Sequence, residues 1–312
     1  MRALRLTALQ TVPELLETDA PEPVPGANQV LVQVFAAGVT PTELLWYPTS
    51  HNKDGSERTG AISGHEFSGV IAALGSAVNG HSIGDEVFGM NDWFADGATA
   101  EYCVADTSSI ARKPASLTHA EAAAVPIGAL TALQGLERAR LRAGQRILVQ
   151  GGAGAVGVFV IQMARMRGAH VITTASARNL EFLLGLGAER AIDYSAERFE
   201  EQVQDLDVVL DCVGGDTLRR SWSVLQPGGR MVTIAADGEA TEDSRLKDAF
   251  FIVEPNSQQL AETGTLLDQG KLRVFVDAEL PLSEAAAAYS REIESRLGYG
   301  KTVIVMPAFQ NR

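Results

Sequence analysis

Short segments in the first third of the chain alternate apolar and polar positions, which is the pattern of half-buried β-strands. Glycines recur within and between these segments, where tight corners or bulges need them. The chain up to about Pro114 therefore predicts a curled antiparallel barrel. The expected strands are Arg2–Leu9, Gln29–Val39, Glu66–Gly75, Asp85–Met90 and Ala100–Ala105.

The pattern changes after Pro114. Residues 118–139 are helical in pattern, with Pro126 marking a break. From Arg146 onward, near-continuous apolar strands alternate with helical segments, which predicts a parallel sheet covered on both faces. The expected strands are Arg146–Gln150, His170–Ala175, Arg190–Tyr194, Asp207–Val213 and Gly229–Ala235, and the intervening helices include Asn179–Ala188 and Gly215–Leu225.

The last part of the chain predicts one amphipathic helix, Ser283–Leu297, and one strand, Lys301–Met306. A single helix and a single strand cannot enclose a core of their own. We therefore expect them to return to the first domain. A length of 312 residues is consistent with two domains.

Composition and charge narrow the classes of function. The net charge of −13 argues against nucleic acid and anionic membranes as main partners, because both attract basic surfaces. No apolar run approaches the roughly 18 residues of a membrane span, and Pro13 and nearby acids come too early for a secretory signal. Two cysteines exclude a disulfide framework, so a reducing cytoplasm is the expected location.

Three glycines follow the first strand of the parallel sheet and open a helix. Gly152, Gly154 and Gly157 fit G-x-G-x-x-G, and Gly151 offers an alternative register. Glycine lets the backbone turn sharply and lets a pyrophosphate approach, while the helix N-terminus offers free N–H groups. In this strand–helix context the motif predicts dinucleotide binding. The alternative is a tight turn with close strand–helix packing.

The residues after the second strand of this sheet favour NADP(H). An NAD site typically has an acid about 20 residues past the glycines, but here no acid occurs before Glu181. Ser176 and Arg178 stand there instead, and a hydroxyl and a guanidinium suit a 2′-phosphate. The structural alternative is a helix N-cap, from Ser176 or Asn179, beside a surface arginine.

Several segments in order resemble the zinc-free quinone oxidoreductase branch of the medium-chain dehydrogenase/reductase superfamily. Besides the glycine loop they are Gly64–Gly75, Gly84–Met90, Ala122–Leu136, Val209–Gly215, Leu225–Val232 and Gly300–Val305. The resemblance implies an α/β protein with a GroES-like β-barrel domain and a Rossmann doubly wound parallel sheet. The implied ranges are 1–118 for the catalytic domain, 119–254 for the NADP(H)-binding domain, and 255–312 returning to the catalytic domain. It further implies NADPH in a cleft between the domains and a homodimer.

The resemblance also implies roles for particular residues. Ala153, Gly154, Ala155 and Val156 fall on the phosphate-loop positions, and Ser176 and Arg178 on the 2′-phosphate positions. Tyr194 falls where the family often adds a tyrosine to that phosphate, although a strand-end aromatic with a hydrated hydroxyl is equally compatible with the sequence. The positions expected near the nicotinamide are Thr40, Thr131, Cys212, Val213, and the stretch Phe250–Val253 with Phe251 and Val253.

The expected catalytic zinc ligands of the superfamily are largely replaced. His65 is kept, but Thr40 and Ile127 stand where two cysteines would be, and only Cys103 lies near the missing four-cysteine lobe. A catalytic zinc needs about three protein ligands, and His65, even with Glu66, does not supply them. We therefore predict no metal, with His65 as a hydrogen-bonded core residue.

Without a Lewis acid, acceptors that delocalise the incoming charge are favoured, namely quinones and enones with a conjugated C=C bond. Thr40 is the leading candidate donor to the developing oxyanion, with Tyr47 second. Residues 44–48 alternatively form an apolar patch, and the polar loop 50–60 either covers substrate or is a surface connection. Two other hypotheses for the function remain. One is an NADPH-binding structural or regulatory protein with little turnover, and the other is a zinc alcohol dehydrogenase.

Overall fold

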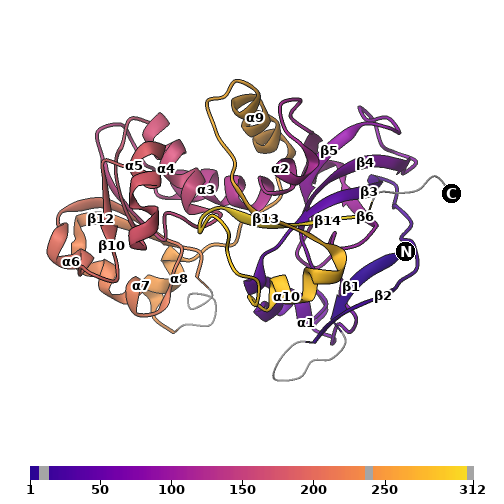
Figure 1. Cartoon of the computed structure of the whole chain (residues 1–312), viewed down its shortest axis with the longest axis horizontal. Helices are drawn as coiled ribbons and strands as arrows, with labels where there is room; N and C mark the ends of the chain where they lie inside the picture. The colour runs from indigo at the N-terminus through magenta and orange to yellow at the C-terminus, as the bar shows by residue number, and fades with distance from the viewer. Residues whose placement is uncertain (7–13, 236–241, 308–312) are drawn as a thin grey trace. The chain divides into compact units, whose positions relative to one another are not determined.

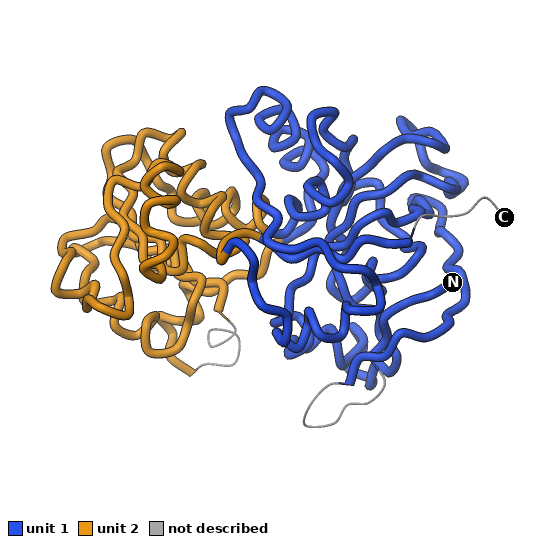
Figure 2. The backbone as a smooth tube through the Cα atoms, viewed as in Figure 1, with its two compact units in different colours: residues 1–127, 254–297, 301–312 blue, residues 128–253, 298–300 orange. Residues whose placement is uncertain are grey.

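The computed structural model describes residues 1–6, 14–235 and 242–307. The chain divides into two compact units, drawn in blue and orange in Figure 2. Unit 1 comprises residues 1–127, 254–297 and 301–312, and unit 2 comprises residues 128–253 and 298–300. Unit 1 thus extends beyond position 118, the boundary suggested by the sequence.

Unit 1 is built on a seven-stranded sheet of order β13-β14-β3-β4-β5-β7, with β6 also paired to β3. All its pairs are antiparallel except β13 with β14. The strands are β3 (Gln29–Gly38), β4 (Glu66–Leu74), β5 (Glu86–Met90), β6 (Tyr102–Asp106), β7 (Ile110–Arg112), β13 (Val276–Pro281) and β14 (Lys301–Val305), and β1 (Arg2–Leu6) pairs with β2 (Leu15–Asp19) separately.

Strand β14 carries the tail of the chain into the unit 1 sheet. It pairs antiparallel with β3, with Val303 opposite Gly38. Side chains of β3, β4 and β14 share one apolar core with Leu280 and Tyr289 from the tail. Burial of these apolar side chains stabilises the unit because apolar area is removed from water. The helices of this unit include α1 (Tyr47–Ser50), α2 (His119–Ala123), α9 (Ser257–Asp268) and α10 (Ala285–Tyr289).

Unit 2 contains the predicted parallel sheet, with order β10-β9-β8-β11-β12. The order 3-2-1-4-5, counted along the chain, is that of a doubly wound fold, in which ligands bind at the carboxyl ends of the strands. The strands are β8 (Arg146–Gln150), β9 (His170–Ala175), β10 (Arg190–Asp193), β11 (Leu206–Asp211) and β12 (Leu225–Thr233).

Helices cover both faces of the unit 2 sheet (Figure 1). Helices α4 (Gly157–Met166) and α5 (Leu180–Leu186) pack against β8, β9 and β10. The other face is covered by α6 (Phe199–Gln202), α7 (Gly215–Ser221) and α8 (Ser244–Ala249), whose Phe199, Leu218 and Ala249 share a core with Leu148 and Val209 of the sheet. Helix α3 spans Pro126–Arg138.

Two predictions for the tail were wrong. The helix expected over Ser283–Leu297 is limited to α10, because Arg291 has a φ of 58° and the following residues are mostly exposed and polar. One helix and one strand are also too few for the tail, because β13 and α9 precede α10. Helix α9 has 12 residues, and its N-cap Asn256 accepts a hydrogen bond from the Gln259 N–H at 2.9 Å. Residues 7–9 of the first expected strand lie outside the described residues.

No helix within the described ranges combines the length and apolar character needed to cross a membrane.

Candidate functional site

The glycine loop connects β8 to α4, and its three glycines have different surroundings. Gly152 and Gly157 are buried. A Cβ atom on Gly152 would lie 3.0 Å from Ile161 Cδ1, and one on Gly157 would lie 2.7 Å from the Cα of Gly152, so both are required by packing within the chain. Gly154 is exposed, and a Cβ there would meet nothing closer than the Gly151 carbonyl at 3.4 Å.

The loop also offers hydrogen-bond donors at the N-terminus of α4. The N–H groups of Ala155 and Val156 donate to no backbone acceptor in the part of the chain that is described. The N-terminal end of a helix carries a partial positive charge, so free N–H groups there bind anions. Because Gly154 also leaves open space, the loop fits the close approach of a dinucleotide pyrophosphate.

Ser176 and Arg178 follow β9, as the sequence analysis expected. Ser176 occupies an N-cap position, yet among the described residues its side chain makes no capping hydrogen bond, and neither does that of Asn179. Arg178 is exposed, and no carboxylate in the described ranges lies within ion-pair distance of it. The guanidinium is thus available to an external anion.

Residues 298–300, for which the sequence predicted no role in the site, complete this part of unit 2. The Gly300 N–H donates to the Ala153 carbonyl of the glycine loop at 3.0 Å. The Asn179 side-chain amide donates to the Gly298 carbonyl at 2.8 Å, and the Tyr299 ring stacks on Phe182 with centroids 3.6 Å apart. The run Gly-Tyr-Gly was the available signal, because glycines beside a buried strand permit close approach.

Arg178 lies directly against this segment. Gly298 has a φ of +83°, and a Cβ atom on it would be 2.6 Å from the Arg178 guanidinium carbon. A side chain at this position would therefore displace the guanidinium. The structure thus brings together the glycine loop and Arg178 through one short segment of the tail.

The turn after β11 lies beside the same loop. Val213 is 54% exposed, and its Cγ2 would be 3.0 Å from a Cβ atom on Gly151. The buried Asp211 carboxylate holds this turn by accepting the Gly214 N–H at 3.0 Å. Burial raises the pKa of the Cys212 thiol, and the Asp211 charge adds to this effect. The thiolate form of Cys212 is therefore disfavoured.

The remaining predicted nucleotide-site residues differ in exposure. Tyr194 is 65% exposed at the end of β10, whereas Thr131 of α3 is 3% exposed and Val253 is 5% exposed. Phe251 is partly buried, and its N–H donates to the Thr233 carbonyl at 3.2 Å. Only Tyr194 among these four has an open side chain.

In unit 1, Thr40 is partly exposed and lies beside a buried ion pair. The Lys301 ammonium donates a hydrogen bond to Thr40 Oγ1 at 2.7 Å and is also paired with Glu66. Burial raises the pKa of Glu66, although the Lys301 charge acts in the opposite direction. Neither Lys301 nor its contact with Thr40 was expected from the sequence, since a lysine in a short strand is usually solvated.

His65 is hydrogen-bonded at both ring nitrogens. Nδ1 lies 3.0 Å from a carboxylate oxygen of the buried Glu43, and Nε2 lies 3.3 Å from the Ala95 carbonyl oxygen. The other Glu43 oxygen accepts the Gly64 N–H at 2.6 Å. Within the described residues, no group of three histidine, cysteine, aspartate or glutamate side chains could hold a metal ion.

Tyr47 and residues 53–57 of the polar loop after it are exposed, and a few contacts hold the loop in place. Tyr47 is 47% exposed, and its ring stacks on His51 at 4.3 Å. Arg58 is 8% exposed and anchors the loop by donating to the Ala95 carbonyl at 2.6 Å and to Asp96 at 2.8 Å. The side chains of residues 44–48 differ in packing. Trp46 packs edge-on against Trp93, whereas Leu45 is 75% exposed.

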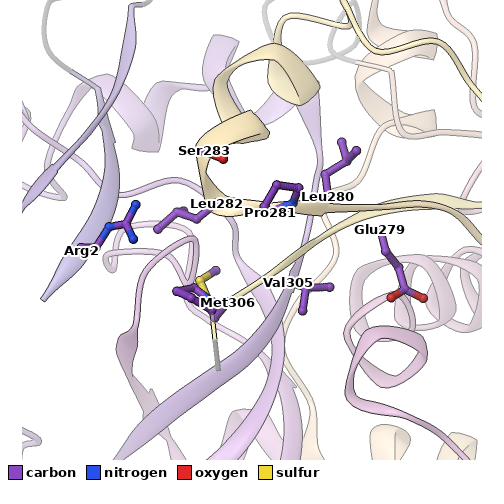
Figure 3. A pocket seen from close by; sticks show the side chains of 9 residues that line it. Arg2, Glu279, Leu280, Pro281, Leu282, Ser283, Val305 and Met306 are labelled. Atoms are coloured by element: carbon purple, nitrogen blue, oxygen red, sulfur yellow. The ribbon is translucent and has the colours of Figure 1, made fainter. Parts of the chain in front are cut away.

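A cavity of about 430 Å³ lies elsewhere in unit 1 (Figure 3). It is lined from β1, β13 and β14 and by the residues that follow these last two strands, and it contains none of the predicted site residues. The lining side chains are Arg2, Glu279, Leu280, Pro281, Leu282, Ser283, Val305, Met306 and Pro307.

Two family profiles match the sequence. Residues 26–133 match the alcohol dehydrogenase GroES-like domain, and residues 186–304 match the zinc-binding dehydrogenase family. The word zinc-binding belongs to the description of the second family and is not a statement about this chain. In this chain, Thr40 and Ile127 occupy the positions where the resemblance expects cysteine ligands.

Named relatives match almost the whole chain. The 2-methylene-furan-3-one reductase of Solanum lycopersicum is 34% identical, over 93% of this chain and 74% of the relative. The chloroplastic NADPH-dependent alkenal/one oxidoreductase of Arabidopsis thaliana is 33% identical, over 96% and 75%. The structure of the quinone oxidoreductase from Coxiella burnetii aligns with a TM-score of 0.87 at 32% identity, covering 98% of this chain and 99% of the other.

Proposed function

Because this chain belongs to the medium-chain dehydrogenase/reductase superfamily, among its quinone and alkenal oxidoreductases, we propose that it reduces a quinone or an enone-type C=C bond with NADPH. The observation that carries the cofactor half of this proposal is the glycine loop. It has open space at Gly154, and its Ala155 and Val156 N–H groups donate to no backbone acceptor in the described residues.

The residues of unit 2 are assigned to cofactor binding. The N–H groups of the loop hold the pyrophosphate, and Ser176 and Arg178 hold the 2′-phosphate, with Tyr194 beside them. We place five further residues at the nicotinamide on the strength of the family resemblance, namely Thr131, Cys212, Val213, Phe251 and Val253. NADPH, when bound, supplies the hydride.

The Thr40 hydroxyl is assigned to the acceptor oxygen. Reduction of a quinone or an enone leaves negative charge on that oxygen, and a hydrogen-bond donor stabilises this charge more strongly in the transition state than in the ground state. Tyr47 is the second candidate donor. Because Thr40 and Ile127 replace two expected cysteines, we propose that the reaction does not use a metal ion.

A homodimer and a cytoplasmic location are also proposed. The homodimer follows from the resemblance, and the location from the use of only two cysteines. The matching relatives include proteins named chloroplastic and mitochondrial, so the location is to be tested by fractionation of the native source.

The decisive experiment is a screen of NADPH oxidation with benzoquinone, phenanthrenequinone, an alkenone and an enoyl thioester, each against a control without acceptor. We expect steady turnover with at least one acceptor, unchanged after dialysis against a chelator. Tight NADPH binding without turnover of any acceptor would favour a structural or regulatory protein. Activity that disappears with the chelator and returns with zinc would contradict the metal-free mechanism.

A further inference from the structure

The pairing of two strands places a lysine opposite the candidate oxyanion donor. In the ladder of β14 and β3, Val303 lies opposite Gly38, and the Val39 N–H donates to the Thr302 carbonyl at 3.0 Å. Continuing this antiparallel register by one more residue sets Lys301 opposite Thr40. The Lys301 ammonium then reaches Thr40 Oγ1 at 2.7 Å.

The positive charge of Lys301 is buried and compensated within unit 1. Lys301 is 5% exposed, and its partner Glu66 is fully buried. A buried charge is costly unless it is paired and hydrogen-bonded. The second Glu66 oxygen accepts the Ile127 N–H at 2.8 Å, which fixes the carboxylate in place.

Gly38 makes this ion pair possible. A Cβ atom at Gly38 would lie 2.6 Å from the carboxylate carbon of Glu66, so only glycine lets the Glu66 side chain cross β3 toward Lys301. The neighbouring buried carboxylate, Glu43, is directed to the Gly64 N–H and the His65 ring instead. Glu66 is therefore the carboxylate that holds Lys301 beside Thr40.

An ammonium group can only donate hydrogen bonds. Thr40 Oγ1 must therefore be the acceptor from Lys301, which leaves the hydroxyl hydrogen of Thr40 free for another oxygen. The adjacent cation also polarises the hydroxyl and makes it a stronger donor, because hydrogen bonds in a chain reinforce one another. A donor that is fixed before the reaction stabilises an oxyanion without reorganisation.

We propose that Lys301 is a positioning residue, which orients and polarises the Thr40 hydroxyl as the donor to the acceptor oxygen. This inference rests on the proposed function, since it assigns Thr40 to the same oxygen. It differs from a purely structural role, in which Lys301 would only fasten β14 to the sheet through Glu66.

The test is a double-mutant cycle in the full-length chain. Because Lys301→Met alone would leave Glu66 buried without a partner, the neutral pair Glu66→Gln/Lys301→Met is used. It is combined with Thr40→Val, which removes the hydroxyl and keeps the shape. Thr40→Ser, which keeps a hydroxyl, is the conservative rescue variant. Lys271→Met, at an exposed lysine of unit 1, is the matched control.

With benzoquinone as acceptor, Thr40→Val should lower kcat by roughly a hundredfold, the usual effect of losing one oxyanion donor. The neutral pair should lower kcat by at least about tenfold, with the Kd for NADPH unchanged in both. If Lys301 acts through Thr40, the triple variant should be no slower than Thr40→Val. The proposal would be overturned if the reductions in kcat multiplied in the triple variant. It would also be overturned if the neutral pair lowered the unfolding temperature and left kcat unchanged.

Binding of para-nitrophenol gives a readout that needs no turnover. Its absorbance reports how much of the bound phenol is ionised, and a polarised donor should increase the ionised fraction in the wild type and in Thr40→Ser. The increase should disappear in Thr40→Val and in the neutral pair. If no acceptor turns over but this pattern is observed, the proposed function fails and the positioning role stands; without the pattern, the positioning role is refuted.

Discussion

Arg178 is the single side chain on which selectivity between NADPH and NADH is expected to depend. It is exposed, it lies against Gly298, and no carboxylate in the described ranges is paired with it. A charge-assisted hydrogen bond contributes about 1.5–3 kcal/mol. Arg178→Ala should therefore weaken NADPH binding by roughly ten- to a hundredfold and leave NADH binding nearly unchanged, as measured by nucleotide fluorescence titration.

The matched control is Arg219→Ala, which removes another exposed arginine of unit 2. It should change neither affinity. An equal loss of NADPH and NADH binding in Arg178→Ala would instead mean that the guanidinium supports the fold of the loop or contacts a part common to both nucleotides.

At the residue scale, local sequence patterns predict the position of a side chain better than its contacts. Ser176 and Arg178 lie after β9, as expected, because that position is set by local chain geometry. The contact of Lys301 with Thr40 was not expected, because it depends on β14 lying beside β3, a pairing between residues far apart in sequence. Glu43 was missed for the same reason, since its partners Gly64 and His65 come from another part of unit 1.

At the scale of the strand–loop–helix element, two glycines of one motif should respond differently to the same change. Gly154→Ala meets only ordinary contact, at 3.4 Å, so the fold should be unaffected while the added methyl group occupies space needed by the cofactor. Gly157→Ala would press on the backbone of Gly152 at 2.7 Å and should lower stability as well, by about 1–3 kcal/mol.

The two effects are separated by measuring the unfolding temperature without nucleotide and the Kd for NADPH. We expect Gly154→Ala to keep the wild-type unfolding temperature and to bind NADPH at least about tenfold more weakly, a loss of about 1.4 kcal/mol. Wild-type affinity in Gly154→Ala would show that the open space at this glycine is not used by the cofactor.

The predicted elements were most accurate where apolar residues formed clear runs. The five strands of the parallel sheet were expected from near-continuous apolar runs, and all five are present in unit 2. Helix α9 was missed because its cap, Asn256, is a weak signal without a strong apolar stripe. The helix at Ser283–Leu297 was extended too far, because Tyr289, Ile293 and Leu297 keep a helical spacing in the sequence although the helix ends before Arg291, whose φ is 58°.

At the scale of the whole molecule, acidic groups outnumber basic ones, 39 to 26, so ion pairs that hold acids in place affect stability in acid. Glu200 on α6 is the clearest example. Partial burial acts to raise its pKa, but hydrogen bonds from the backbone, Arg198 and Arg220 lower the pKa to about 2 from its ordinary 4.5. The folded chain therefore binds this proton less readily than the unfolded chain.

Since the folded-state pKa is the lower one, this contribution to stability is present above pH 4.5 and is lost as the pH falls toward 2. Glu200→Gln should be less stable than the wild type at neutral pH, and the difference should shrink over that interval. Thermal unfolding at a series of pH values measures it, with Glu181→Gln, at an exposed glutamate of α5, as the control. A difference that stays constant with pH would contradict the assignment.

The hydrogen bond from Gly300 to Ala153 has a consequence for the biosynthesis of the protein. A chain is made from its N-terminus, and domains begin to fold as they emerge from the ribosome. The parallel sheet of unit 2 is fully synthesised by residue 233, whereas the segment that contacts its glycine loop is added only at residues 298–300. A nascent chain that extends only to β12 therefore lacks the hydrogen bond from Gly300 to Ala153, and we expect it to bind NADPH more weakly than the full chain.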